Sequence, residues 1–267
     1  RNRLEKGLKE RGASVGIHEG YLDREFKIPE ETECVITIGG DGTMLRASRA
    51  ALDRNVVFLG VNRGHMGYLT ELTRIDDYDE IIDRLINNDF KIEERMMLSA
   101  SAYRGGKRVY RDYALNDVMI GKNDFVHMMS FELYINDTLI NTYRADGVVI
   151  ASPTGSTCYS MSAGGPIAEP TAKLLLVTPI CPHSLNQRSI IFAADDEIMI
   201  EMKDNKSSSG RRTGSLKNDS ARVATFDGES FCEVVTGDRI VITQSERISK
   251  FVKTSRISFL ERIRNKM

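Results

Sequence analysis

The strongest structural signal in the chain is CVITIGGDGT, which runs from Cys34 to Thr43. Its first five residues are apolar or β-branched, a composition typical of a short strand that is buried on both faces. The glycines that follow allow a tight turn, and the apolar spacing of Met44 to Leu52 predicts a helix directly after it. We therefore predict a strand, a glycine-rich turn and a helix over residues 34–52.

The same alternation of helix and strand extends to both sides of this stretch. Residues 1–11 predict a short helix, residues 55–61 a second buried strand, and residues 76–88 a helix with one apolar face. Strands and helices that alternate at this spacing are typical of a parallel sheet covered by helices. We therefore predict a Rossmann-like α/β domain with a parallel sheet over residues 1–95.

A different pattern begins near residue 90, after which apolar and polar residues mostly alternate, as in half-buried strands. Gly105-Gly106 and Asn136-Asp137 each separate two such runs, and both pairs are hairpin signals. The polar segment 204–220 is expected to form a mobile hairpin tip. We predict a β-rich, sandwich-like domain over residues 96–247. Its further strands are expected at 148–151, 174–177, 190–193, 198–202, 223–226 and 240–243.

The composition excludes several classes of protein. The 267 residues carry 37 Lys and Arg against 38 Asp and Glu, a formal net charge of −1. This balance disfavours a protein that binds nucleic acid or membranes by bulk electrostatics. No apolar run approaches the roughly 18 residues that span a bilayer. The four cysteines include no C-x-x-C pair, which argues against a zinc ribbon or thioredoxin-type site and favours reduced thiols in a cytoplasmic protein.

Asp41 lies inside the glycine-rich turn, where the first N–H groups of a helix favour an anion. A carboxylate there repels phosphate, so its presence makes sense if Asp41 takes a proton from a hydroxyl or holds a metal bound to phosphate. The alternative is structural, with Asp41 as the N-cap of the helix, and spacing alone leaves both open. The chain has no G-x-x-x-x-G-K-[ST], and Leu45 stands where G-x-G-x-x-G requires a glycine. A P-loop NTPase is thus excluded, and an oxidoreductase is disfavoured.

Two more motifs lie in the second part of the chain. The first is DGVVIASPTGSTCYSMSAGGP, residues 146–166, in which a β run leads into small hydroxylated residues. Hydroxyls and N–H groups at this density suit a polar ligand such as a nucleotide better than they suit an ordinary loop. The second is Asn116-Asp117, an amide and a carboxylate that could bind a ribose diol but that, taken alone, most often mark a turn.

In this order and spacing, the motifs resemble those of the NAD kinase family. Residues 39–43 look like its GGDGT motif, and Asn116-Asp117 occupies the place of its Asn-Glu pair. Residues 146–166 look like its DG…TPTGSTAYSLSAGGP block, and residues 178–185 look like its TPICPHSL segment. GGDGT alone is shared with diacylglycerol kinases, sphingosine kinases and phosphofructokinases, whereas the later blocks are far more specific. The resemblance covers about residues 35–228, most of the chain.

The resemblance implies ATP-dependent phosphorylation of NAD on the 2′-hydroxyl of its adenosine ribose, giving NADP. It implies an α/β domain and a β-rich dinucleotide-binding domain, with residues 248–267 returning to the first. It also implies a divalent metal cation, Mg²⁺ or Mn²⁺, and a homo-oligomer, either a dimer or more commonly a tetramer. The motifs leave open the choice between NAD and NADH, the choice between ATP and polyphosphate as donor, and the identity of the metal ligands.

The resemblance also implies roles for single residues. Asp41 would be the general base that accepts the 2′-hydroxyl proton, Gly42 would bring backbone close to the substrate, and Arg46 could reach phosphate. Asn116 and Asp117 would hold a ribose diol, and Tyr159 is the candidate to stack on adenine or nicotinamide. The full set of nucleotide-binding positions adds His127, Arg144, Asp146, Thr154, Thr157, Cys158, Ser160, Met161 and Ser162.

The chain departs from the family pattern at three positions. Asp117 is one methylene shorter than the common Glu, Cys158 replaces Ala, and Glu229 stands where many members have Gln. Two other classes of protein share part of the pattern. One is a lipid or sugar kinase that shares GGDGT; a lipid kinase would require an apolar groove or a membrane face, and the sequence shows neither. A non-catalytic dinucleotide-binding sensor is disfavoured because Asp41 is intact.

Overall fold

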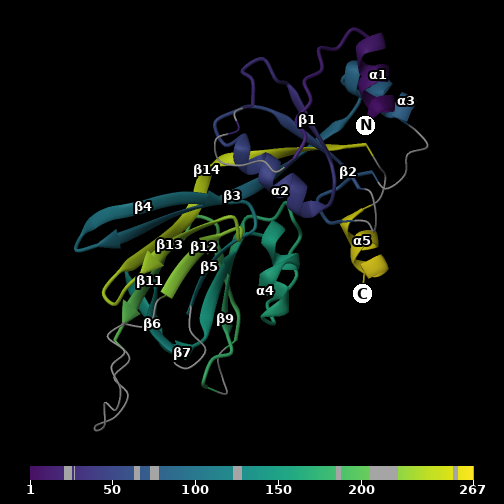
Figure 1. Ribbon diagram of the computed structural model, residues 1–267. Helices are drawn as coiled ribbons and strands as arrows, with labels where there is room; N and C mark the ends of the chain where they lie inside the picture. The colour runs from purple at the N-terminus through teal and green to yellow at the C-terminus, as the bar shows by residue number, and fades with distance from the viewer. Residues whose placement is uncertain are drawn as a thin grey trace. The chain divides into compact units, whose positions relative to one another are not determined.

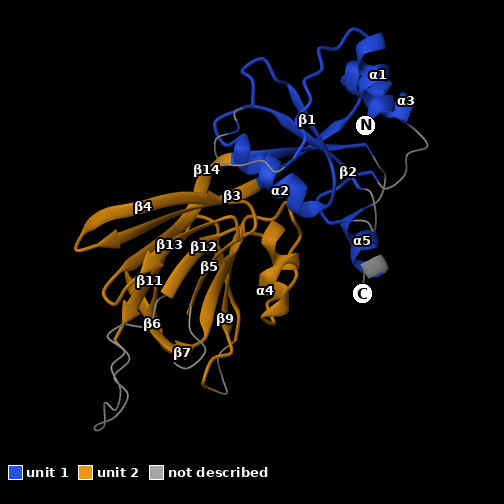
Figure 2. Ribbon diagram, in the orientation of Figure 1, with its two compact units in different colours: residues 1–95, 248–267 blue, residues 96–247 orange. Residues whose placement is uncertain are grey.

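The computed structural model describes residues 1–20, 26, 28–62, 67–72, 78–122, 128–184, 188–204, 222–254 and 258–266. These residues form two compact units (Figure 2). Unit 1 comprises residues 1–95 and 248–267, and unit 2 comprises residues 96–247. The predicted hairpin tip at 204–220 lies, apart from its first residue, outside the described residues.

Unit 1 is an α/β structure, as predicted. Strands β1 and β2 are parallel, and β2 also pairs in parallel with the end of β14 at residues 250–251. Unit 1 contains α1 (Asn2–Glu10), β1 (Cys34–Ile38), α2 (Asp41–Ala50), β2 (Val57–Val61), α3 (Tyr78–Ile86), α5 (Phe259–Lys266) and the last part of β14 (Arg239–Lys253) (Figure 1). Buried Leu59 and Val252 connect β2 and β14 in one apolar cluster, so these strands are packed as well as hydrogen-bonded.

One detail of the sequence prediction for unit 1 is wrong. Of β1 only Thr37 is fully buried, whereas four of the five residues of β2 are. The reason is position, because β1 lies at the edge of the described sheet while β2 has a strand on each side. The burial predicted for both strands is therefore found in β2 but not in β1.

Helices α1 and α3 pack against each other through a small apolar cluster. Leu4 of α1 contacts Tyr78 and Ile82 of α3 in this cluster, together with Val61 of β2. Gly7 makes the close approach possible, since a Cβ there would lie 2.6 Å from Cδ1 of Ile82. The two helices are held to the sheet by apolar burial.

Unit 2 consists of two antiparallel sheets that share one core, as the β-rich, sandwich-like prediction requires. One sheet has the order β4-β3-β14-β11-β6-β7 and the other β10-β9-β8-β5-β12-β13. Fully buried Phe131 and Ile198 of the first sheet lie in the same apolar cluster as Val118 and Ile150 of the second. The strands are β3 (Lys91–Arg104), β4 (Lys107–Ala114), β5 (Asp117–Lys122), β6 (Met129–Ile135), β7 (Thr138–Ala145), β8 (Gly147–Ala151), β9 (Leu174–Ile180), β10 (Ile190–Ala193), β11 (Ile198–Lys203), β12 (Arg222–Phe226), β13 (Ser230–Val234) and β14.

Both predicted hairpin turns in unit 2 are confirmed. Gly105 and Gly106 have φ of +55° and +78° between β3 and β4, and Asn136 and Asp137 have φ of +47° and +62° between β6 and β7. Positive φ at both central residues is the geometry of the hairpin turns that match strand twist. The two dipeptides therefore indicated the turns because each supplies two residues with positive φ.

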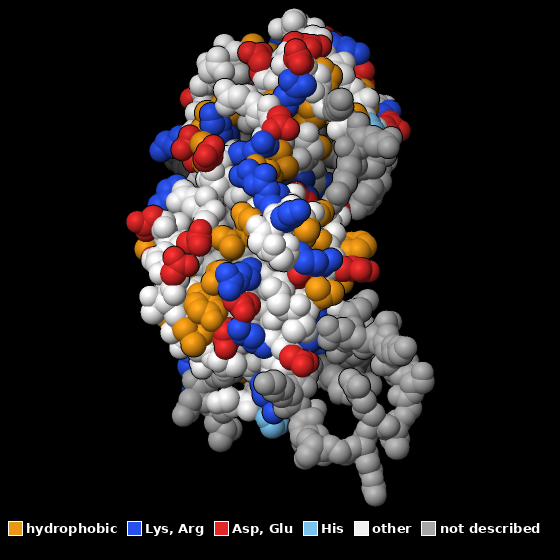
Figure 3. Space-filling model, turned by 90° about the vertical axis from the view of Figure 1, so that its left-hand side faces the viewer, with side chains coloured by type: hydrophobic (Ala, Val, Ile, Leu, Met, Phe, Trp, Pro, Cys, Tyr) orange, Lys and Arg blue, Asp and Glu red, His pale blue; other side chains and the backbone are white. Residues whose placement is uncertain are grey.

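Charged side chains of both signs are interspersed over the face of the molecule shown in Figure 3. This mixture of signs fits the net charge of −1. Within the described ranges, the helices are too short and too polar for any of them to cross a membrane.

Candidate active site

The GGDGT motif forms the turn between β1 and α2. Gly40 has extended backbone, with φ −94° and ψ −172°, and it is the N-cap of α2, so Asp41 is the first residue of the helix. The structural alternative, in which Asp41 itself caps the helix, is therefore wrong. Gly39 leaves no room for a side chain, because a Cβ there would lie 2.3 Å from Oγ1 of Thr43.

The Asp41 carboxylate is held by residues 67–70, which we call the carboxylate turn. The backbone N–H of Tyr68 donates to Oδ2 at 2.7 Å, and those of Leu69 and Thr70 donate to Oδ1 at 3.1 and 3.2 Å. A carboxylate has about four lone-pair positions, so these three donors leave about one for a further hydrogen bond. The side chain is thus fixed in place and still able to accept a proton.

Gly67 gives the Asp41 carboxylate the space that it occupies. A Cβ at this position would lie 1.9 Å from Oδ1 and 2.5 Å from Cγ of Asp41. The N–H of Gly67 in turn donates to Oγ1 of Thr70 at 3.1 Å, which closes the carboxylate turn on itself. Sequence reasoning did not give this turn a role, because nothing in residues 67–70 indicates that they meet a residue 27 positions away.

The other two predicted residues of unit 1 lie on α2 with Asp41. Gly42 is exposed, and Arg46 is half-buried one helical turn further on. A Cβ at Gly42 would lie 3.9 Å from Nη1 of Arg46, so the guanidinium extends back toward the start of the helix. The N-terminus of a helix and an arginine together suit an anionic group such as phosphate.

In unit 2, the Asn116-Asp117 pair connects β4 to β5, and Asp117 is the first residue of β5. The carboxylate of Asp227 accepts hydrogen bonds from the backbone N–H groups of Leu115, Asn116 and Asp117 at 2.9, 2.8 and 3.2 Å. Asp227 and Gly228 have φ of +55° and +67° in the turn between β12 and β13. Sequence reasoning missed this role of Asp227, although an Asp-Gly pair between two β runs is a hairpin signal.

The side chain of Asn116 carries an unpaired acceptor. Asn116 is 9% exposed, and its buried Oδ1 has no hydrogen-bond partner among the described residues. A buried polar atom that lacks a partner costs about 1–3 kcal/mol of stability. A hydroxyl donated by a ligand would remove that cost, so this atom is suited to a ribose.

Burial raises the pKa of the neighbouring carboxyl group, that of Asp117. Removal from water and, to a smaller extent, charge repulsion from the nearby Asp227 carboxylate together raise the pKa of Asp117 to about 7. Near neutral pH, Asp117 therefore exists in both its protonated and its ionised form. The protonated form can donate a hydrogen bond as well as accept one.

We expect Asp117→Asn to change how stability depends on pH. Because the pKa of Asp117 is raised in the folded state, its contribution to stability is full below the unfolded value near 4 and is lost as the pH rises through about 7. The wild type should thus lose on the order of 2–3 kcal/mol more than the variant between pH 5 and pH 8. Urea unfolding at both pH values measures this difference.

The matched control for this experiment is Asp195→Asn, at an exposed aspartate of the same unit. Its free energy of unfolding should follow that of the wild type at both pH values. Parallel pH curves for the wild type and Asp117→Asn would show that the Asp117 carboxyl is not titrating in this range.

The residues that follow β8 pack on the Asn116-Asp117 connection. The N–H of Ser152 donates to the carbonyl of Asn116 at 2.8 Å, and its hydroxyl donates to the carbonyl of Leu115 at 2.5 Å. Gly155 lies so close that a Cβ would come within 2.1 Å of the Asn116 carbonyl oxygen. The structure thereby brings together two motifs that are separated by about 30 residues in the sequence.

Several hydroxyls of this segment bond within the protein. The hydroxyl of Ser156 donates to the carbonyl of Pro153 at 2.6 Å, that of Thr157 donates to the carbonyl of Thr154 at 3.3 Å, and the hydroxyls of Ser160 and Thr178 lie 3.2 Å apart. Much of the hydroxyl density seen in the sequence therefore holds the backbone in shape. Ligand contacts by Thr154, Thr157 and Ser160, all buried, stay predictions.

The short helix α4 (Tyr159–Ser162), labelled in Figure 1, has three exposed residues. Tyr159 is 45% exposed and Met161 is 40% exposed, and Ser162 is exposed as well. Cys158, just before the helix, is half-buried. An exposed tyrosine ring offers a face on which a planar base can stack.

Three further predicted residues lie outside α4 and the segment before it. Asp146, between β7 and β8, forms an ion pair with Lys122 at 2.7 Å. Arg144 is exposed on β7. His127 lies outside the described residues.

A preformed metal cage is not present in the described parts of the chain. No group of three or more His, Cys, Asp or Glu side chains lies close enough there to hold an ion. The four cysteines are free thiols, and burial raises the pKa of Cys34 to about 12 and that of Cys232 to about 11. These two thiols are therefore poor metal ligands, because a thiol binds metal as thiolate.

Comparison with known proteins gives consistent matches along the chain. The family described as the ATP-NAD kinase N-terminal domain matches residues 14–90, and the one described as the ATP-NAD kinase C-terminal domain matches residues 115–254. The NAD kinase of Lachnospira eligens is 66% identical over 240 residues, 90% of this chain and 82% of that protein. The NAD kinase of Lachnoclostridium phytofermentans is 37% identical over 250 residues, 93% and 84% of the two chains.

Two solved structures share the fold. An NAD kinase from Archaeoglobus fulgidus in complex with ATP superposes with a TM-score of 0.76 at 23% identity, covering 99% of this chain and 91% of that one. Yeast NADH kinase complexed with NADH superposes with a TM-score of 0.74 at 24% identity, covering 87% of this chain and 65% of that one. At these identities, the likeness concerns the two-domain fold alone.

Proposed function

This chain belongs to the NAD kinase family, and on that premise we propose that Asp41 is the general base in the transfer of the γ-phosphoryl group of ATP to the 2′-hydroxyl of the adenosine ribose of NAD. Membership makes the protein a kinase, a transferase that phosphorylates NAD with ATP to give NADP. The observation that carries the assignment of Asp41 is its carboxylate, which three backbone N–H groups fix while about one acceptor position is left.

The proposed reaction follows from the chemistry of a ribose hydroxyl. Its pKa lies far above 7, so it attacks well only as its proton leaves. The bond between the 2′-oxygen and the γ-phosphorus forms, the bond from that phosphorus to the bridging oxygen of ADP breaks, and the proton passes to Asp41. Most of the remaining acceleration in phosphoryl transfer comes from positioning and electrostatics, which the start of α2 and Arg46 would supply.

Unit 2 would bind the dinucleotide. We propose that Asn116 and Asp117 hold a ribose diol, because the unpaired Oδ1 of Asn116 can accept from a hydroxyl and a protonated Asp117 can donate to another. Tyr159 would stack on a base. The remaining contacts are proposed for His127, Arg144, Asp146, Thr154, Thr157, Cys158, Ser160, Met161 and Ser162, as the family resemblance implies.

We further propose that a divalent cation, Mg²⁺ or Mn²⁺, accompanies ATP. The described side chains do not form a cage for it, so its ligands would come chiefly from phosphate oxygens and water, as is usual for Mg²⁺. A cytoplasmic location, consistent with the free thiols, and a homo-oligomer such as a homotetramer are proposed from the resemblance as well.

The direct test is turnover of the purified protein with NAD or NADH and with ATP or polyphosphate. We expect NADP to form from NAD and ATP when magnesium or manganese is present and formation to stop when EDTA is added. A dehydrogenase specific for NADP quantifies the product, and ³¹P NMR distinguishes a 2′- from a 3′-phosphate. Preferential phosphorylation of diacylglycerol would instead indicate a lipid kinase. Tight NAD binding without turnover under any metal or donor would indicate a sensor.

A further inference from the structure

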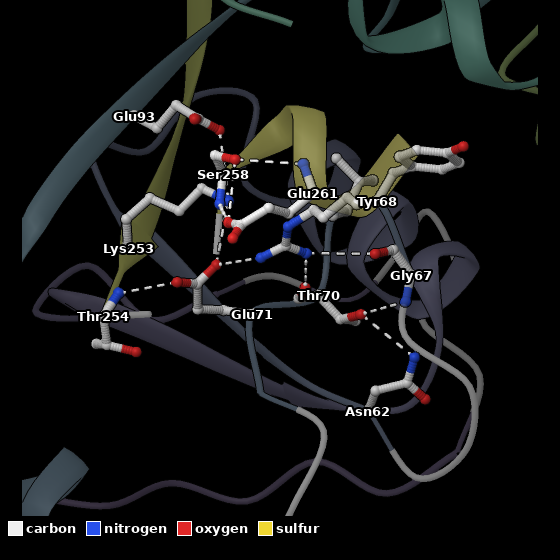
Figure 4. Close-up of polar contacts among 12 residues, drawn as sticks. Asn62, Gly67, Tyr68, Thr70, Glu71, Glu93, Lys253, Thr254, Ser258 and Glu261 are labelled. Atoms are coloured by element: carbon white, nitrogen blue, oxygen red, sulfur yellow. Dashed lines mark hydrogen bonds and ion pairs between the residues drawn. The ribbon is translucent and has the colours of Figure 1, made fainter. Parts of the chain in front are cut away.

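The C-terminal helix α5 contributes one buried arginine to unit 1. Arg262 is only 2% exposed, and its guanidinium donates through Nη1 to the carbonyls of Thr70 and Gly67 at 2.6 and 3.3 Å. Nη2 donates to the carboxylate of Glu71 at 2.8 Å. Figure 4 shows Gly67, Thr70 and Glu71 gathered around these contacts. All three partners belong to the carboxylate turn or follow it directly.

The carboxylate turn is therefore bound from two sides. Its N–H groups donate to Asp41, and its carbonyls accept from Arg262. Thr70 takes part in both sets of bonds, since its N–H donates to Asp41 and its carbonyl accepts from Arg262. We propose that Arg262 is a positioning residue that holds the carboxylate turn, and through it the Asp41 carboxylate, in the geometry for proton transfer.

Two further sets of contacts fix Arg262, one between Glu71 and the end of β14 and one at the start of α5. Glu71 accepts from the N–H of Thr254 at 3.0 Å and forms an ion pair with Lys253 at 3.1 Å, which ties the end of β14 to the same carboxylate (Figure 4). Ser258 and Glu261 exchange hydrogen bonds at 3.2 and 2.7 Å, which is a capping box at the start of α5. The first turn of α5, and with it Arg262, is thus fixed relative to the carboxylate turn.

Only an arginine can make this set of contacts. The guanidinium is planar and carries five donors in a fixed fork, so it can bond two carbonyls and a carboxylate at once. A lysine in this place keeps the charge that Glu71 requires but offers a single point of attachment. Arg262→Lys therefore separates the positioning of the turn from the pairing of the buried charge.

The inference rests on the proposed role of Asp41, and its test is kinetic. We expect Arg262→Lys to lower kcat by about 10–100-fold and to change the KM for NAD and for ATP by less than about threefold, because a misplacement on the order of 1 Å costs about 10²-fold in rate. In the Asp41→Asn background, the same change should have no further effect on the residual kcat, because the two residues act through one carboxylate.

The control is Arg264→Met, an exposed position on the same helix, which should keep the kcat of the wild type. Hydrogen exchange of the Tyr68, Leu69 and Thr70 amides should be at least about tenfold faster in Arg262→Lys and unchanged in Arg264→Met. If Arg262→Lys does not fold, Glu71→Gln, which leaves the two carbonyl bonds of Arg262 in place, should give a smaller loss of kcat with the same unchanged KM.

Each failure has its own signature. If the wild type does not phosphorylate NAD, the proposed function is wrong. If Asp41→Asn keeps near-normal kcat, the base is wrong, and the role of Arg262 with it. If Asp41→Asn loses kcat while Arg262→Lys keeps that of the wild type, only the positioning role is overturned. A further tenfold loss from Arg262→Lys in the Asp41→Asn background also overturns it, because the arginine would then act independently of Asp41.

Discussion

Asp41→Asn is expected to lower kcat for NADP formation by about 10²–10⁴-fold, the range over which a general base contributes. The amide has nearly the same shape as the carboxylate, but its oxygen cannot take the proton of a ribose hydroxyl. Its NH₂ group would also face N–H donors of the carboxylate turn, where the carboxylate now accepts three hydrogen bonds. The loss should therefore combine missing proton transfer with a displaced side chain.

Binding of NAD should survive the same change. Most of the residues proposed to hold the dinucleotide lie in unit 2, while Asp41 lies in unit 1. Calorimetric titration with NAD should give a Kd within a few fold of the wild type, and the coupled dehydrogenase assay gives kcat. Asp53→Asn, at an exposed aspartate just beyond α2, is the matched control and should keep full activity. Near-normal turnover in Asp41→Asn would rule out the proposed base.

Gly155→Ala is expected to have the largest effect on unit 2, because the new methyl group would meet backbone. Its Cβ would lie 2.1 Å from the carbonyl oxygen and 2.5 Å from the carbonyl carbon of Asn116. Neither atom can move aside easily, since the Asn116 N–H is bonded to Asp227 and its carbonyl accepts from Ser152. Overpacking of this kind costs about 1–3 kcal/mol, and urea unfolding measures the loss.

The same substitution should weaken NAD binding. A shift of the Asn116 backbone moves the unpaired Oδ1 and the Asp117 carboxyl that are proposed to hold the ribose. We expect KM for NAD to rise at least about tenfold, with a smaller change in KM for ATP. Gly16→Ala is the matched control, since a Cβ there has nothing within 4 Å and φ is not positive. Equal stability of Gly155→Ala and Gly16→Ala would show that the segment after β8 is not packed as described.

Local sequence signals predicted most of the elements. They failed where a strand is largely buried, because apolar and polar residues then no longer alternate. β5 was not predicted, because Asp117–Lys122 is largely buried and therefore does not alternate. β13 was not predicted either, although the Asp227-Gly228 pair before it is a recognised turn signal. The predicted helix 44–52 is α2 at 41–50, because the helix begins directly after Gly40 and includes Asp41, Gly42 and Thr43 of the motif.

For the candidate site, the residues proposed to carry chemistry could be named from the sequence because their residue types suggest it. An aspartate among glycines is unusual where it stands, and the Asn-Asp pair after a β run offers an amide and a carboxylate, although such a pair most often marks a turn. The residues that hold them could not be found, because the carboxylate turn bonds Asp41 through its backbone N–H groups, and Asp227 and Arg262 bond backbone groups of their partners. A backbone N–H or carbonyl is the same in every residue, so no sequence pattern records which one is used.

The sequence alone established the α/β and β-rich parts, the glycine turn that carries Asp41, and the resemblance of its motifs to those of the NAD kinase family. Only the tertiary structure established that residues 67–70 hold the Asp41 carboxylate, that Arg262 holds those residues in turn, and that Asp227 fixes the Asn116-Asp117 connection. The physical reason is range: helix and strand periods and turn residues act over a few neighbours. The contacts that fix the carboxylates join residues between 27 and 195 positions apart.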